Sequence, residues 1–214
     1  MADFALPASS SRRLMNTFAV DAESLIAVAI PEQVVTSSLS PIIEIHTAGL
    51  NDLPYPLSTA TLWVACCESW PHADPDWEGL YFINLAIQAD HMFSQVGSDN
   101  QFLTLDVRPG TVFLTNPLAL HWLQPSDKQL NRIAEGLQER RNGYIGLQWE
   151  VAYHEIDAKV LWLKEELEKL GNVEQLGCDI APLLIQPEAD YVQAPPGHDF
   201  VIGPEVRALP RRKS

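Results

Sequence analysis

The chain has 214 residues, 46% of them hydrophobic, and a formal net charge of −14 at pH 7. This length suits one well-filled domain, or a domain with a small appendage. The acidic charge argues against a nucleic-acid partner, because nonspecific binding requires Lys and Arg to neutralise phosphates. No apolar run is long enough to span a bilayer, and three cysteines are too few for a disulfide framework. We therefore expect a cytoplasmic protein that does not associate with membranes.

The two ends of the chain differ in composition from its middle. Residues 1–18 are small, polar and rich in Ser, which is typical of a flexible segment. Short apolar runs follow at Leu25 to Ile30 and Pro41 to Ile45, and they indicate strands, or a strand and a helical turn. Residues 177–214 are rich in Pro, and we interpret them as an extension. A single domain is therefore predicted over residues 19–176.

The central part of the chain predicts a series of short strands. Tyr144 to Tyr153 alternates most clearly, with Ile145, Leu147, Trp149 and Val151 on one side and Tyr144, Gly146 and Gln148 on the other. Turns are expected at Asp90-His91, Arg108-Pro109-Gly110 and Asn116-Pro117. Closely spaced short strands favour an all-β sandwich or barrel. The other predicted strands are Thr61 to Cys67, Leu80 to Gln88, Phe102 to Val107, Thr111 to Thr115 and Leu120 to Gln124.

Two helices interrupt the strands. Ser126-Asp127 is a helix start signal, and the segment that follows is expected to end near Asn142-Gly143. A second helix is predicted from Asp157, with Leu163 and Leu167 among its apolar residues and Gly171 as its stop. Its apolar face could pack on the strands, which we prefer, or on a second subunit, so the sequence leaves the oligomeric state open.

His72-Ala73-Asp74, together with His121, is the pattern with the most chemical content. Side chains two residues apart on an extended segment point to the same side. Two imidazoles and one carboxylate on one face, with other coordination positions open, bind Fe(II) in non-haem oxygenases. The alternative is coincidence, because His-x-Asp is short and occurs in many proteins.

The stretch from Asp106 to His121 is more specific. Its Pro109-Gly110 turn, apolar strand, second turn and final His121 resemble the late strands of the Fe(II)/2-oxoglutarate-dependent oxygenases. The resemblance covers roughly Thr61 to Tyr153, and it implies a mainly β double-stranded β-helix, a jelly-roll barrel with a few flanking helices. It also implies that His72, Asp74 and His121 are iron ligands, with Fe(II) as cofactor and 2-oxoglutarate as co-substrate.

The same resemblance requires a cation for the far carboxylate of 2-oxoglutarate. The family carries this cation on the last strand, and here the sequence departs from the pattern. Lys128 and Arg132 lie near the expected distance past His121 but fall in the predicted helix. Arg141, with Arg140 next to it, lies beside the start of the strand from Tyr144 and matches the position better. Arg is suited to bidentate pairing with a carboxylate. The alternative is that one or both are solvated loop residues.

Three polar strand residues are further candidates for contacts with the co-substrate. Tyr81, Asn84 and Gln148 lie in apolar strands, where a polar side chain must find a partner. A loop backbone would serve equally well. Trp70, Trp77 and Trp122 flank the proposed ligands and could line a substrate pocket or contribute only to packing.

Three functions remain in competition. The first is an oxygenase that hydroxylates or demethylates a small molecule, peptide or protein. The second is a cupin-like metal isomerase or lyase, which needs neither Arg140 nor Arg141. The third is a non-enzymatic acidic binding or inhibitor protein, in which the three metal-ligand residues are accidental.

Overall fold

The computed structural model describes residues 17–21, 25, 28–39, 53–96, 101–139, 142–177, 179–182, 184–186, 191–193 and 201–202. Over these residues the protein is mainly β, as predicted, with few helices. The α-helices are α2 (Glu32–Ser37), α3 (Asp127–Ala134) and α4 (Ile156–Glu168), and the 3-10 helices are η2 (Leu57–Thr59) and η3 (Pro75–Trp77). The strands are β1 (Phe18–Val20), β2 (Leu62–Cys66), β3 (Ser69–His72), β4 (Leu80–Gln88), β5 (His91–Val96), β6 (Gln101–Val107), β7 (Thr111–Thr115), β8 (His121–Pro125), β9 (Tyr144–Ala152), β10 (Val173–Gln175), β11 (Asp179–Pro182), β12 (Leu184–Gln186), β13 (Tyr191–Gln193) and β14 (Val201–Ile202).

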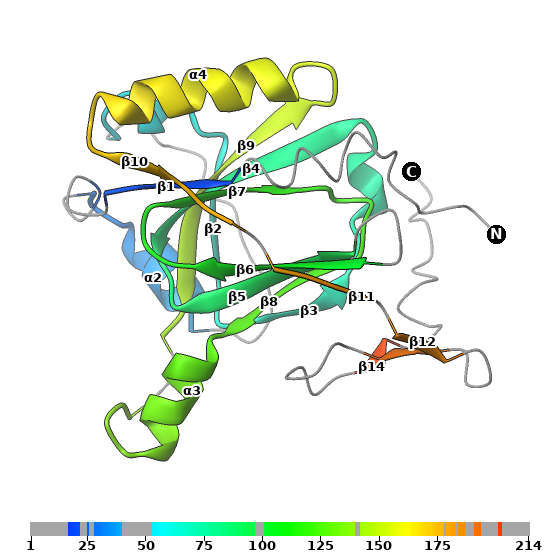
Figure 1. Ribbon diagram of the computed structural model, residues 1–214. Coiled ribbons are helices and arrows are strands. Elements are labelled where there is room, and N and C mark those ends of the chain that lie inside the picture. Colours follow the sequence, from blue (N-terminus) through cyan, green and yellow to red (C-terminus); the bar gives the residue numbers. More distant parts are fainter. Residues whose placement is uncertain are drawn as a thin grey trace.

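Two antiparallel sheets form the body of the molecule. The larger has the order β10-β1-β7-β4-β9-β2, and the smaller has the order β11-β6-β5-β8-β3. A separate three-stranded sheet has the order β12-β13-β14. Figure 1 shows the two main sheets stacked face to face, with α4 along the outer face of the larger one. Strands that are neighbours in the sequence therefore often lie in opposite sheets.

The larger sheet is buried on both faces, and side-chain parity decides which face each residue occupies. Ile83 and Leu85 of β4 belong to the core beneath α4, together with Leu147 and Trp149 of β9. Residues of the opposite parity face the smaller sheet instead. This explains why successive residues of β4, from Tyr81 to Ala86, are all buried.

Most of the predicted elements are confirmed within one or two residues. The exceptions have local causes. His91 begins strand β5, although Asp90-His91 was predicted as a turn, and β3 was not predicted as a strand. Helix α3 begins after its N-cap Ser126, as predicted, but it ends at Ala134 and not near Asn142-Gly143. Gly136 follows with a positive φ of 71°, a conformation that stops a helix.

Strands lie on both sides of the second predicted domain boundary, and the first boundary falls within β1. Phe18 is buried in β1, which pairs with both β10 and β7. Beyond residue 177, β11 pairs with β6 and extends the smaller sheet. In the run from Leu25 to Ile30, predicted as a strand or a helical turn, none of the described residues lies in a strand. The run from Pro41 to Ile45, predicted in the same way, lies outside the described residues, and so does most of the segment before Phe18.

Candidate metal centre

His72, Asp74 and His121 meet at the edge of the smaller sheet. His72 ends β3 and His121 begins β8, and the two residues are direct cross-strand partners. Their rings are 4.4 Å apart between centroids. Asp74 follows β3, and its backbone N–H donates to the carbonyl of Pro117 at 2.7 Å, which fixes the loop beside His121. The register of two strands and this one loop contact thus bring the three residues together.

The ligand atoms of the three residues converge on one point. The distance from His72 Nε2 to Asp74 Oδ1 is 3.7 Å, and from His121 Nε2 to Asp74 Oδ2 it is 3.5 Å. One ligand atom from each residue lies within 4.8 Å of the other two. Such spacing suits three donors around a single ion, since each donor to a bound metal stands about 2 Å from it. The grouping is the one that the sequence predicts.

Backbone carbonyls orient both imidazoles. His72 Nδ1 lies 2.6 Å from the carbonyl oxygen of Trp70, and His121 Nδ1 lies 2.9 Å from that of Ala119. A neutral ring that donates through Nδ1 carries its lone pair on Nε2. In this tautomer both Nε2 lone pairs are free for a metal, whereas a protonated ring would donate from Nε2 to Asp74. Metal-binding histidines are held in this way by a partner on the second ring nitrogen.

The electrostatics of the centre also fit a cation. Burial lowers the pKa of His72, and His121 lowers it further, while Asp74 acts in the opposite direction. Burial of Asp74 would raise its pKa, but the hydrogen bond from His121 and the charge that both imidazoles carry when protonated outweigh burial and lower it. The protein thus favours a neutral His72 beside an ionised Asp74. These are the protonation states that a divalent metal requires of its ligands.

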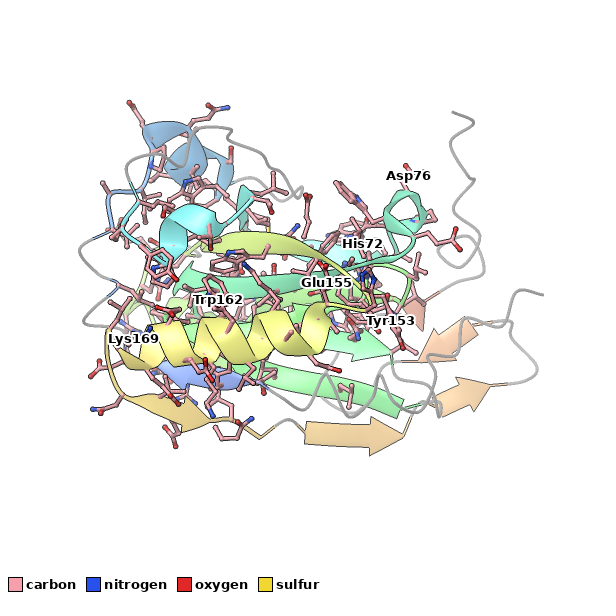
Figure 2. The ribbon with its side chains drawn as sticks, turned by 90° about the horizontal axis from the view of Figure 1, so that it is seen from above. His72, Asp76, Tyr153, Glu155, Trp162 and Lys169 are labelled. Carbon is pink, nitrogen blue, oxygen red and sulfur yellow. The ribbon has the colours of Figure 1, made fainter. Side chains whose placement is uncertain are left out.

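The centre opens into a cavity of about 340 Å³ between the two sheets. Asp74 and His72 are partly exposed, with side chains 31% and 23% accessible, whereas His121 is buried. Figure 2 shows His72 and Asp76 toward the end of the molecule where α4 begins, away from Lys169 at the other end of α4. The cavity is lined by Leu62, Val64, Cys66, Ser69, His72, Asp74, Trp77, Phe82, Asn84, Phe93, Phe113, Thr115, His121, Trp122, Leu123, Tyr144 and Gln148.

The secondary candidates divide according to the faces of the larger sheet. Asn84 and Gln148 line the cavity and are cross-strand partners on β4 and β9. Asn84 Nδ2 donates to Thr115 Oγ1 at 3.1 Å. Tyr81, predicted with them, belongs to the core beneath α4 and does not line the cavity. Tyr81 and Asn84 are three residues apart on one strand, so their side chains point to opposite faces.

The other predicted residues have separate outcomes. Arg140 and Arg141, predicted to bind the far carboxylate of 2-oxoglutarate, lie outside the described residues. Trp77 and Trp122 line the cavity, whereas Trp70 is 75% exposed on the surface. His91 is fully buried, and its Nε2 lies 2.9 Å from the carbonyl oxygen of Cys67, so it is a structural histidine apart from the centre.

Tyr144 is a cavity residue that the sequence did not single out. It begins β9 on the same face as Gln148, and its hydroxyl has no hydrogen-bond partner among the residues that the structure describes. The alternation of the strand placed it on the correct face, but no motif marked it as a binding residue.

The chain matches no family model, no curated protein and no solved structure. Within the part of the chain that the structure describes, no helix has the length and apolar character needed to cross a membrane. The proposals that follow therefore depend on the geometry of the centre and the cavity.

Proposed function

We propose that the protein is a non-haem Fe(II), 2-oxoglutarate-dependent oxygenase that hydroxylates or demethylates a substrate. The observation that carries the proposal is the convergence of His72 Nε2, His121 Nε2 and the Asp74 carboxylate at the mouth of a cavity. Two neutral imidazoles and one carboxylate leave coordination positions free on Fe(II), as in other non-haem oxygenases.

The strand order supports a double-stranded β-helix for β2 to β9. These eight strands divide into β7-β4-β9-β2 in the larger sheet and β6-β5-β8-β3 in the smaller one. Strands at matching positions of the two orders are neighbours in the sequence, as in a jelly roll. In this arrangement the metal ligands come from β3, from the loop after it and from β8, which are the positions that the family resemblance implies.

With Fe(II) and 2-oxoglutarate bound, the centre would supply the oxidation, in which O₂ converts 2-oxoglutarate to succinate and CO₂ while a substrate C–H bond is hydroxylated. The protein supplies position and a dry environment. The carbonyls of Trp70 and Ala119 hold the two imidazoles in place. Phe82, Phe93 and Phe113 line the cavity and make part of its wall apolar.

A cupin-like metal enzyme that uses no 2-oxoglutarate is the second candidate, and one observation favours it. Among the described residues that line the cavity there is no Lys or Arg. A buried carboxylate group of a co-substrate needs a cation or several donors to offset its desolvation. Arg140 and Arg141 are the residues whose replacement separates the two candidates.

The decisive experiment is anaerobic titration of metal-free protein with Fe(II) and then 2-oxoglutarate. We expect one iron per chain and a weak visible charge-transfer band when 2-oxoglutarate is added. His72→Ala and His121→Ala should each lower iron affinity by more than about 100-fold, because losing a ligand costs more than losing an outer partner. His154→Ala is the matched control, because that histidine is 79% exposed.

Three results would contradict parts of the proposal. If His72→Ala and His121→Ala retain iron as the wild type does, the metal centre itself is wrong. If iron binds but 2-oxoglutarate gives no band, the cupin-like candidate is preferred. If the band survives replacement of both Arg140 and Arg141 by Ala, neither arginine binds the far carboxylate.

A further inference from the structure

The inner end of the cavity, where Tyr144 lies, contains a hydrogen-bond donor without an acceptor in the described part of the chain. Tyr144 is 2% exposed, lines the cavity, and has a hydroxyl with no partner among the described residues. Buried polar groups are nearly always paired, and an unpaired one indicates a missing partner. A ligand in the cavity is the partner that this position can accept.

The fold makes room for this hydroxyl. Gly146 lies two residues along β9 on the same face, and a Cβ atom there would lie only 2.3 Å from the Tyr144 hydroxyl oxygen. The phenol therefore lies over Gly146, where any residue with a Cβ atom would collide with it. Burial, and secondarily the nearby Cys66, raise the pKa of Tyr144, so the hydroxyl keeps its proton and acts as a donor.

A continuous row of rings connects Tyr144 to the candidate metal centre. The centroid of the His121 ring lies 6.4 Å from that of Phe93, which lies 4.7 Å from that of Phe113. Phe113 in turn lies 6.4 Å from Tyr144. These separations are typical of rings in contact. A flat apolar ligand body could lie along this row, with one end at Tyr144 and the other near His121.

The charge of the cavity restricts the ligand further. Apart from the three residues of the metal centre, every described lining residue has an uncharged side chain or, in Cys66 and Tyr144, one whose raised pKa keeps it protonated. A buried anion would lack a cationic partner there, which is costly. A neutral acceptor avoids this cost and still satisfies the hydroxyl.

We propose that the inner end of the cavity binds an uncharged carbonyl oxygen, as in an amide or a ketone, through the hydroxyl of Tyr144. The flat apolar body of such a ligand would contact Phe93 and Phe113. Binding at Tyr144 does not depend on the metal. The further statement that the opposite end of this ligand is the end that reacts rests on the proposed oxygenase function.

The test compares three probes of similar shape on full-length, metal-free protein in EDTA. Benzamide offers a neutral carbonyl, benzoate offers an anion, and ethylbenzene offers no acceptor. Dissociation constants would be measured by titration with NMR detection. We expect benzamide to bind at least about tenfold more tightly than benzoate, because burying an anion without a cationic partner costs more than burying a neutral group that is hydrogen-bonded. Benzoate binding as tightly as benzamide would overturn the assignment and indicate a cationic partner.

Tyr144→Phe removes only the hydroxyl. It should weaken benzamide binding about three- to tenfold, the usual effect of one hydrogen bond, and leave ethylbenzene binding unchanged. It should also raise the melting temperature of the ligand-free protein, because an unpaired buried donor is lost. A tyrosine with a purely structural hydrogen bond would lower it. Tyr55→Phe is the control, since Tyr55 is 57% exposed and does not line the cavity.

Unchanged benzamide binding in Tyr144→Phe would overturn the proposal. If this variant does not fold, the comparison of the three probes on the wild-type protein still decides the outcome. Because all probe measurements use metal-free protein, their failure leaves the Fe(II) titration unaffected. Failure of the Fe(II) titration likewise leaves the carbonyl subsite standing.

Discussion

His72 is a partly exposed histidine whose environment favours its neutral form. It lies beside the imidazole of His121 and the carboxylate of Asp74. Burial and His121 together lower its pKa, and Asp74 offsets only part of this effect. A proton and a metal ion therefore compete for the same lone pairs, and acid conditions favour the proton.

This competition predicts a pH dependence of stability in the metal-free protein. The pKa of His72 is lower in the folded state than its usual value of 6.5. The unfolded chain therefore binds more protons below about pH 6.5, so the free energy of unfolding falls as the pH decreases from 7 towards 5. Urea unfolding in EDTA measures this change, and His72→Asn should reduce it. Equal slopes in the two proteins would contradict the pKa shift of His72.

A second prediction concerns two adjacent cysteines. Cys66 is buried beside the cavity, and burial, with smaller contributions from Cys67 and Glu68, raises its pKa to about 12. Cys67 is partly exposed. Because the thiolate is the reactive form, iodoacetamide at pH 8 should label Cys67 at least about tenfold faster than Cys66, as measured by peptide mass spectrometry. Equal labelling rates would show that the cavity admits the reagent and solvent more freely than its lining indicates.

At the scale of elements, the turn between β6 and β7 joins the two sheets and contacts two further strands, β4 and β1. Gly110 has a φ of 86°, and its backbone donates to the carbonyl of Ala86 and accepts from the N–H of Val20. A Cβ atom at Gly110 would lie 2.1 Å from the carbonyl oxygen of Val20. The Pro109-Gly110 pair predicted from the sequence is therefore a turn that also holds β1 in place.

Two glycine substitutions separate the cost of a positive φ from the cost of a collision with β1. Gly110→Ala combines an unfavourable positive φ with a collision with β1, and it should destabilise the protein by about 3 kcal/mol. Gly79→Ala has a similar φ of 90° but nothing within 4 Å of the added carbon, so it should cost only about 1 kcal/mol. Urea unfolding of both variants measures the difference. Equal losses would show that β1 moves aside without cost.

At the scale of the whole molecule, α4 covers the outer face of the larger sheet and completes the main core. Leu163 and Leu167 are fully buried against that sheet, whereas Leu161 is 58% exposed. The helix was predicted to pack on the strands or on a second subunit, and the described contacts place its buried face against the core of the same chain. Helix α4 therefore packs on the face of the larger sheet that is opposite to the cavity.

Paired leucine substitutions test this support. Leu163→Ala should destabilise the protein by about 2–5 kcal/mol, because it opens a cavity in a packed core. Leu161→Ala, in the same helix, should change the free energy of unfolding by less than about 0.5 kcal/mol, as surface substitutions do. Thermal unfolding of both variants checks this. A large effect at Leu161 would indicate that its exposed side packs on another molecule.

The sequence alone determined the mainly β class, most strand positions, the start of both long helices, and the grouping of His72, Asp74 and His121. These follow from local rules, namely alternation, capping, turn residues and the spacing of a short motif. Strand β3 was missed because Pro71 and its bulge disguise the pattern, and β5 was missed because Asp90-His91 resembles a turn.

Only the tertiary structure decided which side of each strand faces the cavity. From the sequence, Tyr81 and Asn84 are equally good candidates for contacts in the cavity, because both are polar residues in an apolar strand. The sequence does not show which face of that strand α4 covers. Helix α4 covers the face that carries Tyr81. Asn84 and Gln148 lie on the opposite face and therefore line the cavity. Likewise, only the tertiary structure shows that the Tyr144 hydroxyl is buried with no partner among the described residues, because burial and pairing depend on contacts between residues distant in the chain.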